Sequence, residues 1–183
     1  MRKTMILIAA AATLFPTWAP AEYMTAPGDI AKQTDQASAQ LNEALSHFHL
    51  MMAAVDLKNS ETALKQQQAF FIGLASAAES YRSTSGKAAE RPLSPKPANP
   101  GDIECIALFN TQAEAFGLKL HASQHDLILK AADLLSQLLK ELDADGMINK
   151  MIGNIPLQQS VTTQVSKITN FLNCATTVIR TGG

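Results

Sequence analysis

Cysteine and histidine, which commonly bind metals or take part in catalysis, are scarce in this chain of 183 residues. It has two cysteines and four histidines. No CxxC motif is present, which argues against redox-active or metal-binding cysteines, and the lack of CxxCH excludes covalently attached haem. GxSxG, HExxH and SxxK motifs and a glycine-rich phosphate loop are also missing, although many hydrolases, zinc peptidases and nucleotide-binding enzymes contain one of them. We therefore expect a protein without catalytic activity and assign no catalytic residue.

An excess of positive charge is missing as well. The chain has 15 basic and 16 acidic residues, a formal net charge of −1, and its basic residues do not cluster. Proteins that bind nucleic acids or anionic membranes depend on concentrated lysine and arginine. The sequence therefore predicts neither kind of partner.

A secretory signal peptide is predicted for residues 1–21. Arg2 and Lys3 form a short basic region, the uncharged run MILIAAAATLF follows, and the small-x-small cleavage pattern APA ends at Ala21. The apolar run is too short to span a bilayer, which takes about 20 residues. We therefore expect an exported, soluble protein, periplasmic or secreted, that begins near Glu22 and has no membrane span. Its 13 basic and 16 acidic residues give a net charge of −3.

Proline placement divides the rest of the chain into helical tracts. Four prolines crowd the segment ERPLSPKPANPG (residues 90–101), and the long proline-free stretches around it are rich in Ala, Leu, Gln, Lys and Glu. Runs of β-branched residues, which are typical of strands, are missing. Apolar residues recur every three to four positions, as on one face of a helix. These tracts begin at Asp29, Ser60, Asp102 and Pro156.

The four tracts predict an all-α fold, an antiparallel bundle of four or five helices. We expect residues 22–183 to form a single domain, with a proline-rich linker over about 84–101 between two helix pairs. In the second tract the inward-facing positions are expected to be Leu64, Gln67, Phe71, Leu74, Ala78 and Tyr81.

Cys105 and Cys174 are predicted to form a disulfide, because an even pair of cysteines in an exported protein is more often bridged than free. A continuous helix over 102–143 would hold their Cα atoms about 30 Å apart, whereas a bridge needs about 7 Å or less. Either the cysteines are unpaired or the tract is broken, and we favour the break. Gly117 offers one position, and the capping-box pattern SQHD that begins at Ser123 offers another.

The four histidines suggest an alternative function, a small carrier of a metal ion or haem. His47 and His49 are two positions apart, so on a helix they point in nearly opposite directions and cannot share an ion. His121 and His125 have the i, i+4 spacing of neighbours on one helix face. If the first and third tracts run parallel from the same end, His49, His121 and His125 reach one level of the bundle and form a transition-metal site. The structural alternative is partly exposed histidines beside core Phe and Met residues.

A second acidic pattern resembles part of a calcium-binding loop. Glu141, Asp143 and Asp145 stand at positions 1, 3 and 5 of an EF-hand loop, with Gly146 at position 6. Position 12, which should supply a bidentate glutamate, is Ile152. Without that ligand we expect no calcium site here, and the simpler interpretation is a helix end followed by a turn.

Three adjacent apolar residues, Phe70, Phe71 and Ile72, stand out in the second tract. A helix cannot bury all three on one narrow stripe, so they indicate either a wide core face or an exposed patch for contact with a partner or with a second copy. Our first hypothesis is therefore an exported helical-bundle protein that acts by protein–protein contact, as an accessory subunit, adaptor or neutralising partner. A homo-oligomer is compatible with this hypothesis.

The signal peptide and the disulfide are tested together by a native mass spectrum of intact, unreduced protein purified from the exported fraction. We expect the mass of a chain that begins near Glu22, lowered by two hydrogens for the bridge. Added mass from a metal ion or haem would favour the carrier hypothesis instead. A chain that keeps its first 21 residues would contradict the predicted export.

Overall fold

The structure is a computed structural model, and it describes residues 27–118, 122–142 and 146–182. Its elements are α1 (Pro27–Asp56), α2 (Ser60–Ser85), α3 (Pro100–Gln112), the 3-10 helix η1 (Glu114–Phe116), α4 (Gln124–Leu142), α5 (Met147–Met151) and α6 (Ile155–Gly182). Outside the helices, the described ranges contain one isolated β-bridge, between Pro92 and Ser123. None of the described helices is both long and apolar enough to cross a membrane. The predicted signal peptide, residues 1–21, lies outside the described ranges.

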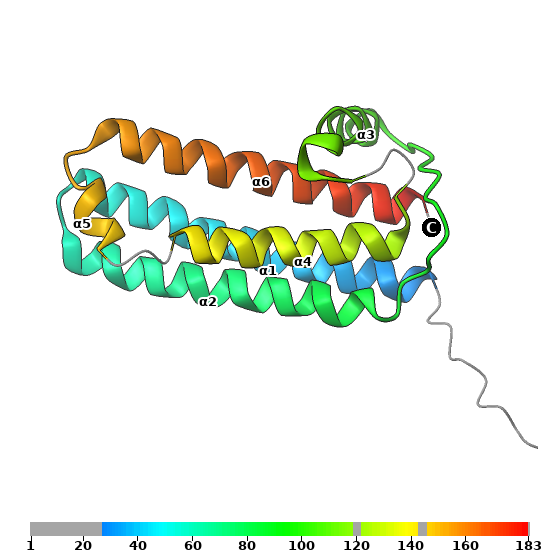
Figure 1. Ribbon diagram of the computed structural model, residues 1–183, viewed down its shortest axis with the longest axis horizontal. Helices are drawn as coiled ribbons and strands as arrows, with labels where there is room; N and C mark the ends of the chain where they lie inside the picture. Colours follow the sequence, from blue (N-terminus) through cyan, green and yellow to red (C-terminus); the bar gives the residue numbers. More distant parts are fainter. Residues whose placement is uncertain (1–26, 119–121, 143–145, 183) are drawn as a thin grey trace, which may run out of the picture.

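Four long helices form an antiparallel bundle (Figure 1). α1 and α4 run in one direction along its long axis, and α2 and α6 run in the other. α1 packs against α2 and α6, and α4 packs against the same two helices, so α1 and α4 lie diagonally opposite each other. The short helix α5 lies at one end of the bundle, and α3 crosses the outside of α6 near the other end. The predicted all-α antiparallel bundle is therefore confirmed.

α1 and α2 pack closely where a glycine of α2 faces an alanine of α1. A Cβ atom on Gly73 would lie 2.7 Å from the Cβ of Ala44, closer than side chains tolerate. Nearby, the rings of Phe48 and Phe70 pack together with their centroids 5.2 Å apart, and both side chains are buried. The missing side chain of Gly73 therefore sets how near the two helices come.

The inward face of α2 differs from the predicted one. Its buried residues are Ala63, Phe70, Leu74, Ala77, Ala78, Tyr81, Thr84 and Ser85. Leu64, predicted to face inward, is 51% exposed, and Phe71 is only partly buried. The close contact at Gly73 turns α2 so that Phe70, rather than its neighbour, faces α1. The apolar pattern of the sequence fits both rotations because the two phenylalanines are adjacent.

A hydrogen bond inside the core joins α2 to α6. The Tyr81 hydroxyl lies 3.2 Å from the hydroxyl of Thr176, and both residues are buried. Burial raises the pKa of the Tyr81 phenol above its ordinary value, because a phenolate would lose its hydration there. The bond therefore gives a neutral polar group a partner in an otherwise apolar layer.

The third tract is broken, as the geometry of the disulfide predicted. α3 ends at Gln112, and Gly117 has a left-handed backbone conformation, φ 74°, which favours glycine. At the start of α4, the Ser123 hydroxyl accepts a hydrogen bond from the Asp126 N–H at 3.0 Å. The Asp126 carboxylate accepts in return from the Ser123 hydroxyl and N–H, which completes a capping box. These two bonds to Ser123 hold the pKa of Asp126 below its ordinary value.

The proline-rich segment between α2 and α3 (residues 86–99) lies against one end of the bundle (Figure 1). The Leu93 N–H donates to the carbonyl of Ala122 at 3.3 Å, just before α4. The Lys96 N–H donates to the carbonyl of Thr181 at 3.0 Å, in the last turn of α6. The segment is therefore tied to α6 and to the residues that lead into α4, although most of its side chains are exposed.

The Gly73 contact is tested by the substitution Gly73→Ala. Helix propensity alone would make the variant more stable by about 1 kcal/mol, but the added methyl group collides with Ala44. Because overpacking costs about 1–3 kcal/mol, we expect a net loss of stability in urea unfolding followed by circular dichroism. Gly86→Ala is the matched control, since a Cβ there meets nothing within 4 Å. A stabilised Gly73→Ala variant would contradict the contact.

Candidate functional site

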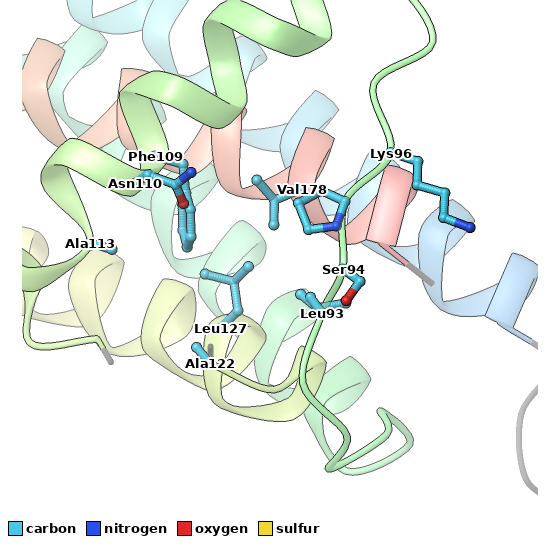
Figure 2. Close-up of a pocket in the computed structure, with 10 residues that line it drawn as sticks. Leu93, Ser94, Lys96, Phe109, Asn110, Ala113, Ala122, Leu127 and Val178 are labelled. Atoms are coloured by element: carbon cyan, nitrogen blue, oxygen red, sulfur yellow. The ribbon is translucent and has the colours of Figure 1, made fainter. Parts of the chain in front are cut away.

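A mostly apolar pocket opens where the proline-rich segment, α3, and the ends of α4 and α6 meet (Figure 2). Leu93, Phe109, Leu127 and Val178 point toward its centre and line it with other residues of these elements. We call it the apolar pocket. Its volume is about 510 Å³, within the range of about 300–1,000 Å³ that is typical of small-molecule sites.

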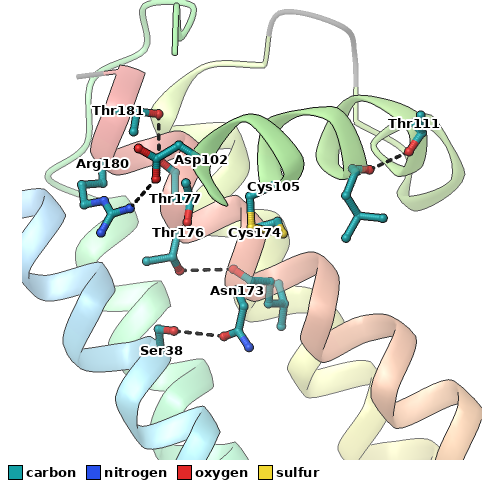
Figure 3. Close-up of a disulfide and its surroundings, with 12 residues drawn as sticks. Ser38, Asp102, Cys105, Thr111, Asn173, Cys174, Thr176, Thr177, Arg180 and Thr181 are labelled. Atoms are coloured by element: carbon teal, nitrogen blue, oxygen red, sulfur yellow. Dashed lines mark hydrogen bonds and ion pairs between the residues drawn. A yellow bond between two sulfur atoms is a disulfide. The ribbon is translucent and has the colours of Figure 1, made fainter. Parts of the chain in front are cut away.

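A disulfide holds one wall of the apolar pocket in place (Figure 3). Cys105 of α3 is bonded to Cys174 of α6, with their Cα atoms 4.7 Å apart, so the predicted bridge is confirmed. One turn further along α3, Phe109 lines the pocket, and its ring stacks on Phe171 of α6 with centroids 5.4 Å apart. The cross-link and this stacking together fix the position of the Phe109 side chain.

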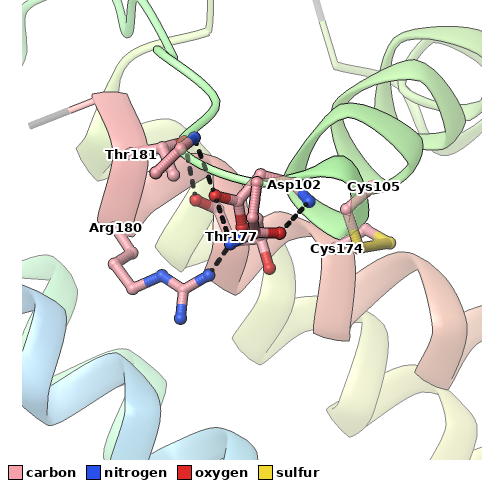
Figure 4. Close-up of polar contacts among 8 residues, drawn as sticks. Asp102, Cys105, Cys174, Thr177, Arg180 and Thr181 are labelled. Carbon is pink, nitrogen blue, oxygen red and sulfur yellow. Dashed lines mark hydrogen bonds and ion pairs between the residues drawn. A yellow bond between two sulfur atoms is a disulfide. The ribbon is translucent and has the colours of Figure 1, made fainter.

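An ion pair fixes the first turn of α3 to α6 as well (Figure 4). Asp102 is 3% exposed, and its carboxylate accepts a hydrogen bond from the Arg180 guanidinium at 2.9 Å. It also accepts from the Ala98 N–H at 3.0 Å and from the Asn99 side-chain amide at 2.9 Å. The buried carboxylate is therefore fully surrounded by donors, as a buried charge requires.

The helix that contains Asp102 begins two residues earlier than expected. Asn99 is its N-cap, since its side chain accepts from the Asp102 N–H at 2.9 Å, and Pro100 takes the first helical position. The sequence placed Asp102 at the start of the helix but gave no sign of its partner Arg180, which lies 78 residues away.

A smaller hollow with a basic lining adjoins the apolar pocket. Its volume is about 260 Å³, and Arg91, Ser94, Lys96 and Thr181 are among its lining residues. We call it the rim hollow. Ser94 and Lys96 line both spaces, so an apolar interior and two cationic side chains meet at the proline-rich segment.

The three adjacent apolar residues of α2 have different surroundings. Phe70 is completely buried, Phe71 is partly buried, and Ile72 is 69% exposed. Leu64, two turns earlier on the helix, is also exposed, and it borders a shallow hollow with Phe71. Leu64, Phe71 and Ile72 lie within an arc of about 100° on the helix surface, and we call them the α2 face.

The structure separates the histidines that the metal hypothesis placed together. His47, on α1, lies beside the first half of α2, where its Nδ1 is 2.8 Å from the side-chain oxygen of Gln66, and His49 is exposed nearby on α1. His125 lies in the first turn of α4, and its N–H donates to the Ala89 carbonyl, beyond the other end of α2.

The separation between these two places excludes a shared ion. His47 and His49 lie near Gln66 of α2, whereas His125 contacts Ala89, which follows the last residue of α2, Ser85. Gln66 and Ser85 are 19 residues apart on that helix, which is about 28 Å at the usual helical rise. Because ligand bonds to zinc are about 2 Å long, His49 and His125 cannot bind the same metal ion. His121 lies outside the described residues. In the described part of the chain, no three His, Cys, Asp or Glu side chains form a group able to hold a metal ion.

The acidic pattern at the end of α4 is described only in part. Asp143 and Asp145 lie outside the described residues. The Glu141 carboxylate accepts hydrogen bonds from the side-chain amides of Gln137 and Gln164, which links α4 to α6. This carboxylate therefore already has two polar partners from the bundle itself.

Comparison with known proteins gives no functional assignment. No family model, curated protein or solved structure matches this chain. We therefore infer its function from the side chains described above.

The Asp102–Arg180 ion pair is tested by Arg180→Gln, which removes the positive charge of the half-exposed Arg180 next to the buried Asp102. Since bonds to a charged group are worth about 1.5–3 kcal/mol, we expect a clear loss of stability in thermal unfolding of the oxidised protein. Arg82→Gln is the matched control, because Arg82 is as exposed as Arg180 but pairs at 3.7 Å with the exposed Glu79 and otherwise donates to the neutral Ser136 hydroxyl. Exposed ion pairs contribute about 1 kcal/mol or less. Equal losses of stability in both variants would mean that the Asp102–Arg180 pair contributes no more than an exposed ion pair.

Proposed function

We propose that this protein is an exported, non-catalytic binding protein that acts by contact with another protein through the α2 face. The observation that supports the proposal is the exposure of Leu64 and Ile72, which are 51% and 69% exposed beside the partly buried ring of Phe71. Large apolar side chains that are grouped on one helix surface favour association, because contact removes them from water.

The residues of the α2 face are held in place by the packing of α2 against α1. On the opposite side of the helix, Gly73 lies against Ala44 and Phe70 packs against Phe48. The three residues of the face therefore keep their relative positions without a partner. A preorganised surface loses little conformational entropy on binding, so more of the contact energy contributes to affinity.

The surroundings of the face also suit a protein partner. The shallow hollow between Leu64 and Phe71 is bordered by Gln67, Gln68 and Lys65, so amide groups form most of its polar edge. Protein interfaces commonly have an apolar centre that is poor in charge and a polar rim that forms hydrogen bonds. We place this contact in the periplasm or outside the cell, on the basis of the signal pattern in residues 1–21 and of a disulfide that suits an oxidising compartment.

The double variant Leu64→Gln/Ile72→Gln tests this function. Both side chains are exposed, so the fold should change in stability by about 0.5 kcal/mol or less, while partner binding should weaken by roughly tenfold or more. Tagged protein is cross-linked in the exported fraction, and the captured proteins are identified and then titrated. Sedimentation of the purified protein measures self-association in the same set of variants.

The matched control is Ile103→Gln/Ile155→Gln, which alters two exposed apolar residues on α3 and α6 rather than on α2. A partner bound by the wild type and the control, and lost in the double variant, supports the proposal. Partners that bind all three proteins alike would show that the α2 face is not the contact surface.

A further inference from the structure

We infer that the apolar pocket and the rim hollow together bind a single-chain amphiphile with one carboxylate, of the fatty-acid type. The acyl chain would occupy the apolar pocket, and the carboxylate would lie in the rim hollow near Arg91 and Lys96. This site is separate from the α2 face and does not depend on the function proposed for that face.

The interior of the apolar pocket suits an alkyl chain. Leu93, Phe109, Leu127 and Val178 project into it from four different elements (Figure 2). Apolar cavities bind apolar molecules in preference to water, because water inside them lacks the polar partners it needs. Burying each methylene group of a chain contributes about 0.8 kcal/mol, so a medium-length acyl group has enough apolar surface for stable binding.

The pocket is formed before any ligand enters. Its α3 wall is held to α6 by the Cys105–Cys174 disulfide and by the Asp102–Arg180 ion pair. Its outer wall, the proline-rich segment, is held by the backbone bonds of Leu93 and Lys96. A preformed cavity avoids the entropy cost of ordering its walls when the ligand binds.

The charge at the rim selects the head group. Lys96 extends away from the apolar side chains, toward the outer side of the segment (Figure 2), and Arg91 lines the same rim hollow. Among the described residues, no carboxylate pairs with either side chain within 4.0 Å. Arg180, by contrast, is already paired with Asp102. Two cations that have no acidic partner in the described part of the chain, next to an apolar cavity, are complementary to an anionic amphiphile.

The experiment measures binding of dodecanoate and of dodecanol to the full oxidised protein by titration calorimetry, near neutral pH and below micelle formation. The wild type should bind dodecanoate more tightly than dodecanol. Arg91→Gln/Lys96→Gln should weaken dodecanoate binding by roughly tenfold or more, equivalent to one lost charge contact, and should leave dodecanol binding unchanged. Lys140→Gln/Lys150→Gln, two exposed lysines far from the pocket, is the control and should bind both like the wild type.

A second variant tests the apolar interior. Ala122→Phe places a ring in the pocket and should weaken the binding of both compounds, with circular dichroism to check that the fold is kept. The α2-face variant Leu64→Gln/Ile72→Gln should bind dodecanoate like the wild type, which separates this site from the proposed protein contact. No dodecanoate binding to the wild type, or equal binding by the wild type and the Arg91→Gln/Lys96→Gln variant, would overturn the inference.

Discussion

The covalent bond between Cys105 and Cys174 is the constraint on which the organisation of one end of the molecule depends. It requires α3 to lie across α6, so the chain must reverse before it can enter the bundle again as α4. Gly117 and the Ser123–Asp126 capping box make that reversal. The four long helices pack against one another, whereas α3 packs on the outside of α6. The apolar pocket depends on the position of α3, because Phe109 of that helix forms one of its walls.

Most of the fold could be predicted from the sequence because it rests on local rules. Helical periodicity, proline placement and the capping box each depend on residues a few positions apart, and the length of a helix was enough to show that the disulfide demands a break. The rotation of α2 could not be predicted, because it depends on how closely Gly73 lets α1 approach. The distance between the two helices depends on which residues face each other across the contact, and the sequence pattern of one helix does not give its partner's residues.

The candidate sites were harder to predict than the fold. The histidine hypothesis assumed that the first and third tracts run parallel, which is true of α4 but not of α3, and it counted positions from Asp102 as though the tract were continuous. The break makes His125 the second residue of a new helix, so the residues between Asp102 and α4 do not carry it along the bundle as a continuous helix would. The apolar pocket gave no signal in the sequence, since its walls come from three separate helices and from a proline-rich segment without periodicity. Arg180 was missed for a related reason, because only the folded chain brings it to Asp102.

Because the disulfide holds one wall of the pocket, the affinity of the pocket for a ligand would differ between the oxidised and the reduced chain. In the reduced chain, the contacts of α3 with α6 are non-covalent, chiefly the Asp102–Arg180 pair and the stacked rings of Phe109 and Phe171. Thermodynamic linkage is reciprocal, so a molecule that binds the oxidised form more tightly makes the disulfide harder to reduce by the same factor. A filled pocket would therefore protect the bond that forms its wall.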